Sequence, residues 1–188
     1  DSQRYGYRHN ISVDDGVFAG DLDFGQLSLI GGQVEHAFNE SFDVVTQAVL
    51  RDQTNTNWKD YVSMAFFRYS PSAKWTFRVG RVAPDLFTIS DYRNINIAYT
   101  WANVPNEVYG MIPYTYIDGA DVSYTQRLED ATLNLKIFGG VSESAISTGN
   151  FTQSIDLEDL IGAALTFDKI DWNLQWRYTY GLIGSNDD

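Results

Sequence analysis

Apolar and polar side chains alternate with a period of two over much of this chain. The clearest case runs from Trp172 to Leu182, where every even-numbered residue is apolar or aromatic and the positions between them are polar or small. Because successive side chains of a β-strand point to opposite faces, this pattern predicts a strand with one apolar and one polar face. The segment is long enough to cross a bilayer as a tilted strand, which takes roughly 9 to 11 residues.

Similar alternation predicts further strands that join as hairpins. We expect them at 161–167, 121–127, 132–138, 61–69, 75–82, 27–34 and 44–51, with a less regular candidate at 17–24. The connections at 70–74, 128–131 and 168–171 are short; the Pro and Ser of 70–74 favour a turn, and 168–171 is polar enough to close a hairpin. The connection between 27–34 and 44–51 includes 37–43. Those at 52–60, 83–118 and 139–159 are long, so short and long connections alternate along the chain.

This alternation of connections predicts an antiparallel up-and-down transmembrane β-barrel, with tight turns at one end and extended loops at the other. We take 1–188 as a single all-β domain. About eight or nine strands are too few for an open lumen, and the last residues read as a loop. The chain is therefore expected to be an incomplete portion of a larger barrel, and the alternative is a small closed barrel without a channel. A soluble β-sandwich is the alternative, because it also consists of many short antiparallel strands.

The amino-acid composition further restricts the class of protein to which this chain can belong. Aromatic residues reach 15%, and such rings commonly gather where a membrane meets water. No run of about 18 apolar residues occurs, so a transmembrane helix is not expected. The net charge of -12 argues against a nucleic-acid partner, which would need a basic surface. The absence of cysteine fits an exported protein without disulfides. The first residues, Asp1-Ser2-Gln3-Arg4, lack the charged and apolar regions of a signal peptide, a segment that a secreted protein would already have lost.

Two segments carry a resemblance to a known family. They are Trp75-Thr76-Phe77-Arg78-Val79-Gly80-Arg81 and Asp118-Gly119-Ala120-Asp121-Val122-Ser123-Tyr124. The chain resembles porins and porin-like proteins of Gram-negative outer membranes. The resemblance implies a location in the cell outer membrane, contact with its lipid and lipopolysaccharide, a homotrimer, and a water-filled channel narrowed by one inward loop.

The segment 83–118 looks most like such a constriction loop. It is the longest connection and carries Asp85, Asp91 and Glu107. Its many aromatic residues predict that it packs against other parts of the protein rather than standing free in water. The alternative is an external loop that lies over the mouth of the barrel.

Charged residues on the polar strand faces are the other candidates for a functional site, because charges near a constriction select ions. Strand parity places five basic residues and one amide on the lumen side: Arg51, Arg68, Arg78, Lys136, Arg177 and Gln175. The alternative role for each is a structural network that fills and stiffens the lumen. Arg81 has the opposite parity, so we expect it at the end of its strand.

Catalysis and metal binding have little support. Only His9 and His36 are available as histidines, and neither lies in a nucleophile motif, so an enzyme is not expected. The acidic residues between 14 and 23 do not have the spacing of a calcium-binding loop, and no cofactor is expected.

The leading hypothesis is passive diffusion of small hydrophilic solutes or ions. The alternatives are a non-conducting barrel that acts as a scaffold or adhesin, and a soluble sugar-binding sandwich.

Overall fold

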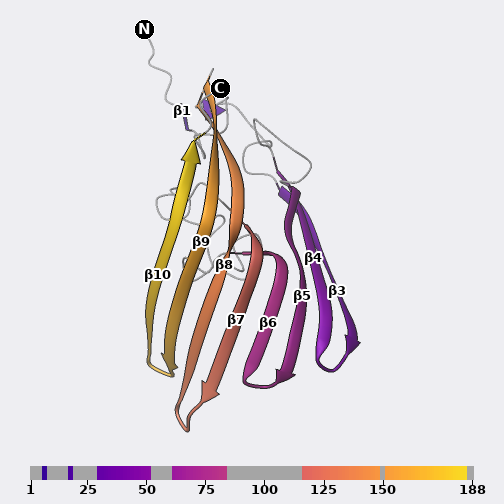
Figure 1. The fold of residues 1–188 in the computed structure, drawn as a ribbon, viewed down its shortest axis with the longest axis vertical. Coiled ribbons are helices and arrows are strands. Elements are labelled where there is room, and N and C mark those ends of the chain that lie inside the picture. The colour runs from indigo at the N-terminus through magenta and orange to yellow at the C-terminus, as the bar shows by residue number, and fades with distance from the viewer. Residues whose placement is uncertain are drawn as a thin grey trace.

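The chain forms one eight-stranded antiparallel sheet in which each strand is bonded to its neighbours in sequence (Figure 1). The computed structural model describes residues 6–7, 17–18, 29–51, 61–83, 116–148 and 151–185. The strands of the sheet are β3 Leu29–Asn39, β4 Phe42–Arg51, β5 Val62–Ser72, β6 Trp75–Val82, β7 Ile117–Arg127, β8 Ala131–Thr148, β9 Phe151–Lys169 and β10 Trp172–Ser185. A separate two-stranded sheet pairs β1 Gly6–Tyr7 with β2 Val17–Phe18.

The predicted order of strands and hairpins is confirmed. Tight turns join β3 to β4, β5 to β6, β7 to β8 and β9 to β10, and all four lie at the lower end of the sheet in Figure 1. In the first of them, the side-chain oxygen of Asn39 accepts a hydrogen bond of 2.9 Å from the backbone N–H of Ser41. Asparagine closes turns in this way because its short side chain mimics a backbone carbonyl.

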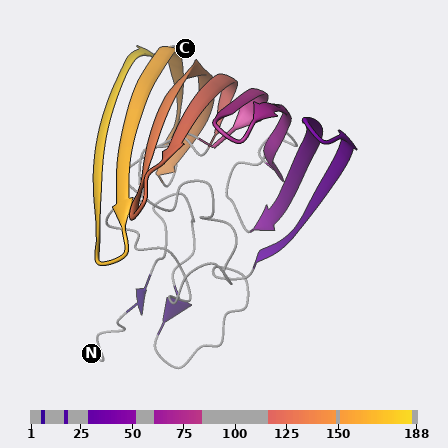
Figure 2. The same cartoon turned by 90° about the horizontal axis from the view of Figure 1, so that it is seen from below.

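The sheet is strongly curved but is not closed into a barrel. Figure 2 shows it as an arch whose edges, β3 and β10, lie apart, and no pairing joins these two strands within the described residues. The prediction of an up-and-down antiparallel β architecture is therefore confirmed, whereas a closed barrel is not present.

Two predicted connections and one predicted strand differ from the structure. The predicted loop at 139–159 is instead the far half of a long hairpin, in which β8 and β9 stay paired as far as Thr148 and Phe151. Serine and threonine are frequent in this segment, and their polarity obscures the alternation of apolar and polar residues in the sequence. The β-branched residues among them still favour a strand, so the backbone pairing between β8 and β9 continues. Residues 37–39 and 42–43 also belong to strands, which leaves a turn of two residues. Of the candidate strand at 17–24, the structure describes only β2.

Glycines on the concave face allow the sheet to bend. Gly80, Gly119 and Gly140 are successive register partners across β6, β7 and β8. Gly80 has a φ of 126°, which side-chain-bearing residues rarely adopt. A Cβ added to Gly119 would lie 2.0 Å from the carbonyl oxygen of Gly139, so the neighbouring backbone leaves no room for a side chain. Glycine kinks of this kind are a recognised source of curvature in β-sheets.

Candidate functional site

A row of charged side chains crosses four strands on the concave face. Asp43 of β4, Arg68 of β5, Arg78 of β6 and Asp121 of β7 are successive register partners, so they lie side by side across the sheet. The two arginines are directly opposite each other, an arrangement that would be repulsive alone. Because an aspartate flanks each arginine, the row as a whole carries no net charge.

The Arg78–Asp121 pair is the most buried part of this row. Arg78 Nε donates to both carboxylate oxygens of Asp121, at 3.0 and 2.8 Å, and its Nη2 lies 2.6 Å from Oδ2. The side chains are only 12% and 1% exposed. The guanidinium carbon also lies 5.1 Å from the centre of the Phe66 ring. This geometry makes Arg78 a neutralised structural cation rather than a lone charge facing water.

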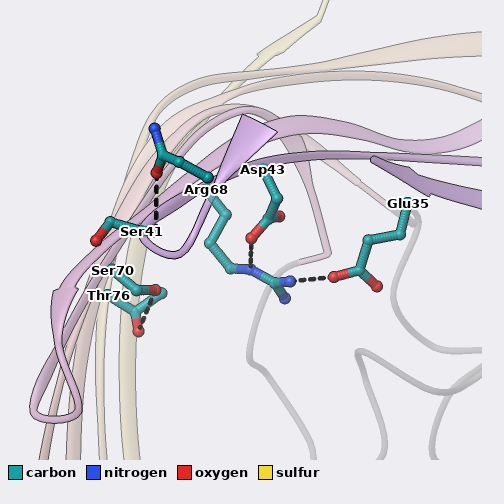
Figure 3. A network of polar contacts seen from close by, with 7 residues as sticks. Glu35, Ser41, Asp43, Arg68, Ser70 and Thr76 are labelled. Carbon is teal, nitrogen blue, oxygen red and sulfur yellow. Dashed lines mark hydrogen bonds and ion pairs between the residues drawn. The ribbon is translucent and has the colours of Figure 1, made fainter. Parts of the chain in front are cut away.

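Arg68 is shared between two carboxylates, as Figure 3 shows on the concave side of the arch. Its Nε donates to Asp43 Oδ2 at 2.9 Å, and its Nη2 donates to Glu35 of β3. Arg68 is one-third exposed and Glu35 about half exposed, at 33% and 48%. This part of the row is therefore more accessible to solutes, and it carries one negative charge in excess.

Neutral polar side chains extend the network on both sides of the charged row. Ser63 Oγ donates to Gln47 Oε1 at 2.7 Å, and Gln47 Nε2 donates in turn to Gln33 Oε1 at 3.1 Å. Closer to the turns, the hydroxyls of Ser70 and Thr76 are 3.3 Å apart (Figure 3). Such linked hydrogen bonds hold side chains in fixed positions along a wall.

A second group of the predicted residues lies across β8, β9 and β10. Lys136 and Arg177 are both register partners of Ala164, so they lie on the same face at either side of a small residue. Arg177 Nη1 donates to Gln175 Oε1 at 2.6 Å. The structure therefore brings Lys136, Arg177 and Gln175 together, but on different strands from Arg68 and Arg78.

The remaining candidates are less completely defined. Arg51 is the last residue of β4 and is the register partner of Leu29. Asp85, Asp91 and Glu107 lie outside the described residues, so their place in a constriction loop stays a prediction. Arg81 lies near the end of β6 on the opposite face, as its parity predicts.

The sequence analysis did not identify the carboxylates that pair with Arg68 and Arg78. Glu35, Asp43 and Asp121 have the same strand parity as the arginines that were predicted to face a lumen, and this was the signal that could have found them. Parity alone did not identify them as partners, because pairing depends on the register between strands.

Beyond the charged row, away from the tight turns, most buried side chains of the concave face are apolar, although Gln47, Ser63 and Ser142 are also buried there. Buried apolar side chains form one cluster: Val45, Met64, Phe66, Val82, Ala83, Ile117, Phe138, Leu157 and Leu160. Val82 and Ile117 are register partners and are both 0% exposed. The concave face thus has a charged row close to the turns and, beyond it, a mainly apolar core that includes the hydrogen-bonded Gln47 and Ser63.

The convex face is apolar and exposed. Leu174 and Trp176 of β10 are 64% and 57% exposed, and β3 to β6, β8 and β9 present similar side chains. Near the tight turns, aromatic rings form a nearly continuous belt. Its successive ring centres lie 4.8 to 6.3 Å apart through Phe38, Phe42, Tyr69, Phe77, Trp75 and Tyr124.

Comparison with known protein families, characterised proteins and solved structures finds no match to this chain. Among the residues that the structure describes, no three histidines or acidic residues are grouped so that they could hold a metal ion. No helix in the described part of the chain is long and apolar enough to cross a membrane. The site is therefore defined by its geometry: a curved antiparallel sheet with a charged, hydrogen-bonded band on one face and an exposed apolar face on the other.

Proposed function

We propose that the chain forms part of the wall of an outer-membrane barrel of the porin type, through which small hydrophilic solutes or ions diffuse. The observation that carries this proposal is the contrast between the two faces of the curved sheet. Large apolar and aromatic side chains are exposed on the convex face, while the concave face holds the charged row of Asp43, Arg68, Arg78 and Asp121. A water-soluble sandwich would instead bury one apolar face against a second sheet.

The inward constriction loop is part of the same proposal. Val82 and Ile117, which bracket the long connection, are both fully buried members of the apolar core on the concave face. Ala83 and Tyr116, one residue further in on each side, are also buried. The connection thus leaves and re-enters the sheet at the centre of the concave core, which favours a loop on the lumen side. Asp85, Asp91 and Glu107 would then face the strands that carry Arg68 and Arg78.

Conductance tests the proposed transport. We expect the full-length protein to form ion-conducting pores in planar bilayers, and deletion of part of 92–109 to raise the single-channel conductance because it widens the passage. A deletion within the tight turn at 170–171 serves as the control and should leave the conductance unchanged. A protein that inserts but does not conduct, with or without the loop deletion, would contradict the channel proposal.

Exchanges on neighbouring positions of β10 test which face meets lipid. Leu174→Arg should destabilise the membrane-inserted protein by about 1 to 2 kcal/mol, because the cost of about 2 to 4 kcal/mol at the bilayer midplane falls toward the interface and Leu174 is two residues above Trp172. Gln175→Arg should be tolerated, because Gln175 lies on the concave face beside Arg177. Urea unfolding in phospholipid vesicles measures both. Equal costs at the two positions would argue against a lipid-facing convex surface.

A second candidate function is a non-conducting barrel that acts as a scaffold or adhesin. The apolar core on the concave face favours it, because buried valine, leucine and phenylalanine side chains fill space that a wide aqueous channel would need. The conductance measurement separates the two candidates. Location in the cell outer membrane, contact with lipid and lipopolysaccharide, and a homotrimeric assembly belong to both proposals.

A further inference from the structure

The exposed part of the charged row is the cluster of Glu35, Asp43 and Arg68 on the concave side of β3 to β5 (Figure 3). Nε and Nη2 of Arg68 each donate to one of the two carboxylates. These contacts hold the guanidinium between Asp43 and Glu35, while one-third of the Arg68 side chain and half of the Glu35 side chain stay exposed. The cluster is therefore a fixed group of charged side chains that a solute can reach.

The Arg68–Glu35 pair keeps hydrogen-bonding capacity for a solute. A guanidinium has five N–H donors, and the two carboxylates take two of those that Arg68 offers. Glu35 accepts through Oε1, which leaves Oε2 for another donor. A hydroxyl group both donates and accepts, so it can bind the carboxylate and the guanidinium side by side. Hydrogen bonds to ionised groups are also stronger than those between neutral groups.

The charge of the cluster favours a positively charged solute. Two carboxylates and one guanidinium leave one negative charge in excess. Arg78, the register partner of Arg68, is buried and neutralised by Asp121, so it does not cancel this excess. Lys136 and Arg177 lie on β8 and β10, three and five strands away from β5. An ammonium group therefore complements the cluster, whereas a carboxylate is repelled.

Neutral polar side chains flank the cluster on the same face. Gln33 lies two residues before Glu35 on β3, and Ser70 lies two residues after Arg68 on β5. Each is about 7 Å along its strand from the charged residue, at about 3.4 Å per residue. Gln33 already bonds to Gln47, which fixes the position of its amide. A solute with several hydroxyl groups can use these neutral partners, but a small cation without hydroxyl groups cannot.

From the remaining donors and acceptors, the excess negative charge and the neutral flanks, we infer that Glu35, Asp43 and Arg68 form a subsite for amino polyols. These are hydroxyl-rich solutes that carry an ammonium group. The ammonium group binds to Glu35, and the hydroxyl groups bind to Arg68 and to the neutral side chains beside it. The inference rests on the proposed function, in which the concave face borders the path of the solute, and it names the class of solute.

Three probes that share one polyol chain test the inference on the full-length protein. Glucamine, sorbitol and gluconate differ only in the terminal group, which is an ammonium, a hydroxyl or a carboxylate. Saturation-transfer NMR titrations in lauryldimethylamine oxide micelles measure the dissociation constants. Glucamine should bind about threefold more tightly than sorbitol, the effect of a partly exposed ion pair, and gluconate should bind least tightly. Butylammonium, which has no hydroxyl group, should bind more weakly than glucamine.

Glu35→Gln separates the contribution of charge from that of hydrogen bonding. It removes the excess charge but keeps an acceptor, so glucamine and sorbitol should then bind equally. Because Glu35 is half exposed, the fold should tolerate this exchange. Glu129→Gln is the matched control: it makes the same change in net charge at the exposed β7–β8 turn and should preserve the threefold difference.

Arg68→Lys tests the donors that bind the hydroxyl groups. It keeps the positive charge but reduces the number of N–H donors from five to three. The two carboxylates still engage the ammonium group, so fewer donors are left for the solute. The dissociation constant of sorbitol should rise by about fivefold, the effect of about one lost hydrogen bond.

Conductance of the same protein in planar bilayers distinguishes failure of the inference from failure of the proposed function. Absence of glucamine binding, equal affinity for glucamine and gluconate, butylammonium that binds as tightly as glucamine, or equal effects of Glu35→Gln and Glu129→Gln would overturn the inference. A protein that conducts but gives any of these results contradicts the subsite alone. A protein that binds glucamine through Glu35 but does not conduct contradicts the channel, and the subsite then belongs to a non-conducting barrel.

Discussion

Asp121→Asn should destabilise the folded protein by about 3 to 5 kcal/mol, the usual cost of removing one partner of a buried ion pair. The Asp121 side chain is only 1% exposed, and its carboxylate accepts hydrogen bonds from Arg78. An amide has nearly the same shape, so the cost arises from leaving the arginine's charge uncompensated. The exchange also removes one of the two carboxylates that compensate the charges of Arg68 and Arg78, which lie opposite each other in the sheet. Equilibrium unfolding of the protein in lipid or detergent measures the change.

Asp130→Asn is the matched control. Asp130 lies beside the β7–β8 turn, 65% exposed, and its Oδ2 is 2.7 Å from Lys169 Nζ. Exposed pairs of this kind contribute about 0 to 1 kcal/mol, so this exchange should be nearly neutral. If both exchanges cost the same, Arg78 is not held as a buried cation and the concave row does not stabilise the wall.

Gly80→Ala should be comparably damaging, by about 3 to 5 kcal/mol. Two effects combine at this position, each of about 1 to 3 kcal/mol: a positive φ that alanine adopts only with strain, and a collision with neighbouring backbone. With a φ of 126°, an added Cβ would lie 2.4 Å from the carbonyl oxygen of Ala65. Relief requires β5 and β6 to separate, which would flatten the curve of the sheet. Thermal unfolding monitored by circular dichroism reports the loss.

Gly32→Ala provides the comparison within the same sheet. Nothing lies within 4 Å of a Cβ at Gly32 on edge strand β3, so alanine should be neutral or slightly stabilising. Equal behaviour of the two variants would show that the bend at Gly80 is not required for the fold.

The local pattern of side chains was sufficient to predict the strands, their order and their two faces. The alternation from Trp172 to Leu182 appears as β10, and the predicted strand 75–82 matches β6 in both bounds. Such predictions succeed because a period of two reflects backbone geometry within one strand and needs no knowledge of its neighbours. Parity also placed Arg68, Arg78, Lys136 and Arg177 on one face, for the same reason.

What depends on two or more strands became visible only in the tertiary structure. Pairing of Arg78 with Asp121 follows from the register of β6 on β7, which joins residues far apart in the chain. The positive φ of Gly80 depends on how closely β5 approaches, and the length of the β8–β9 hairpin depends on continued pairing of polar segments. The open arch results from the curvature summed over eight strands. By itself, the sequence determined which side chains share a face, because that is local. Only the tertiary structure decided which of them meet, because contacts between strands are set by register and curvature.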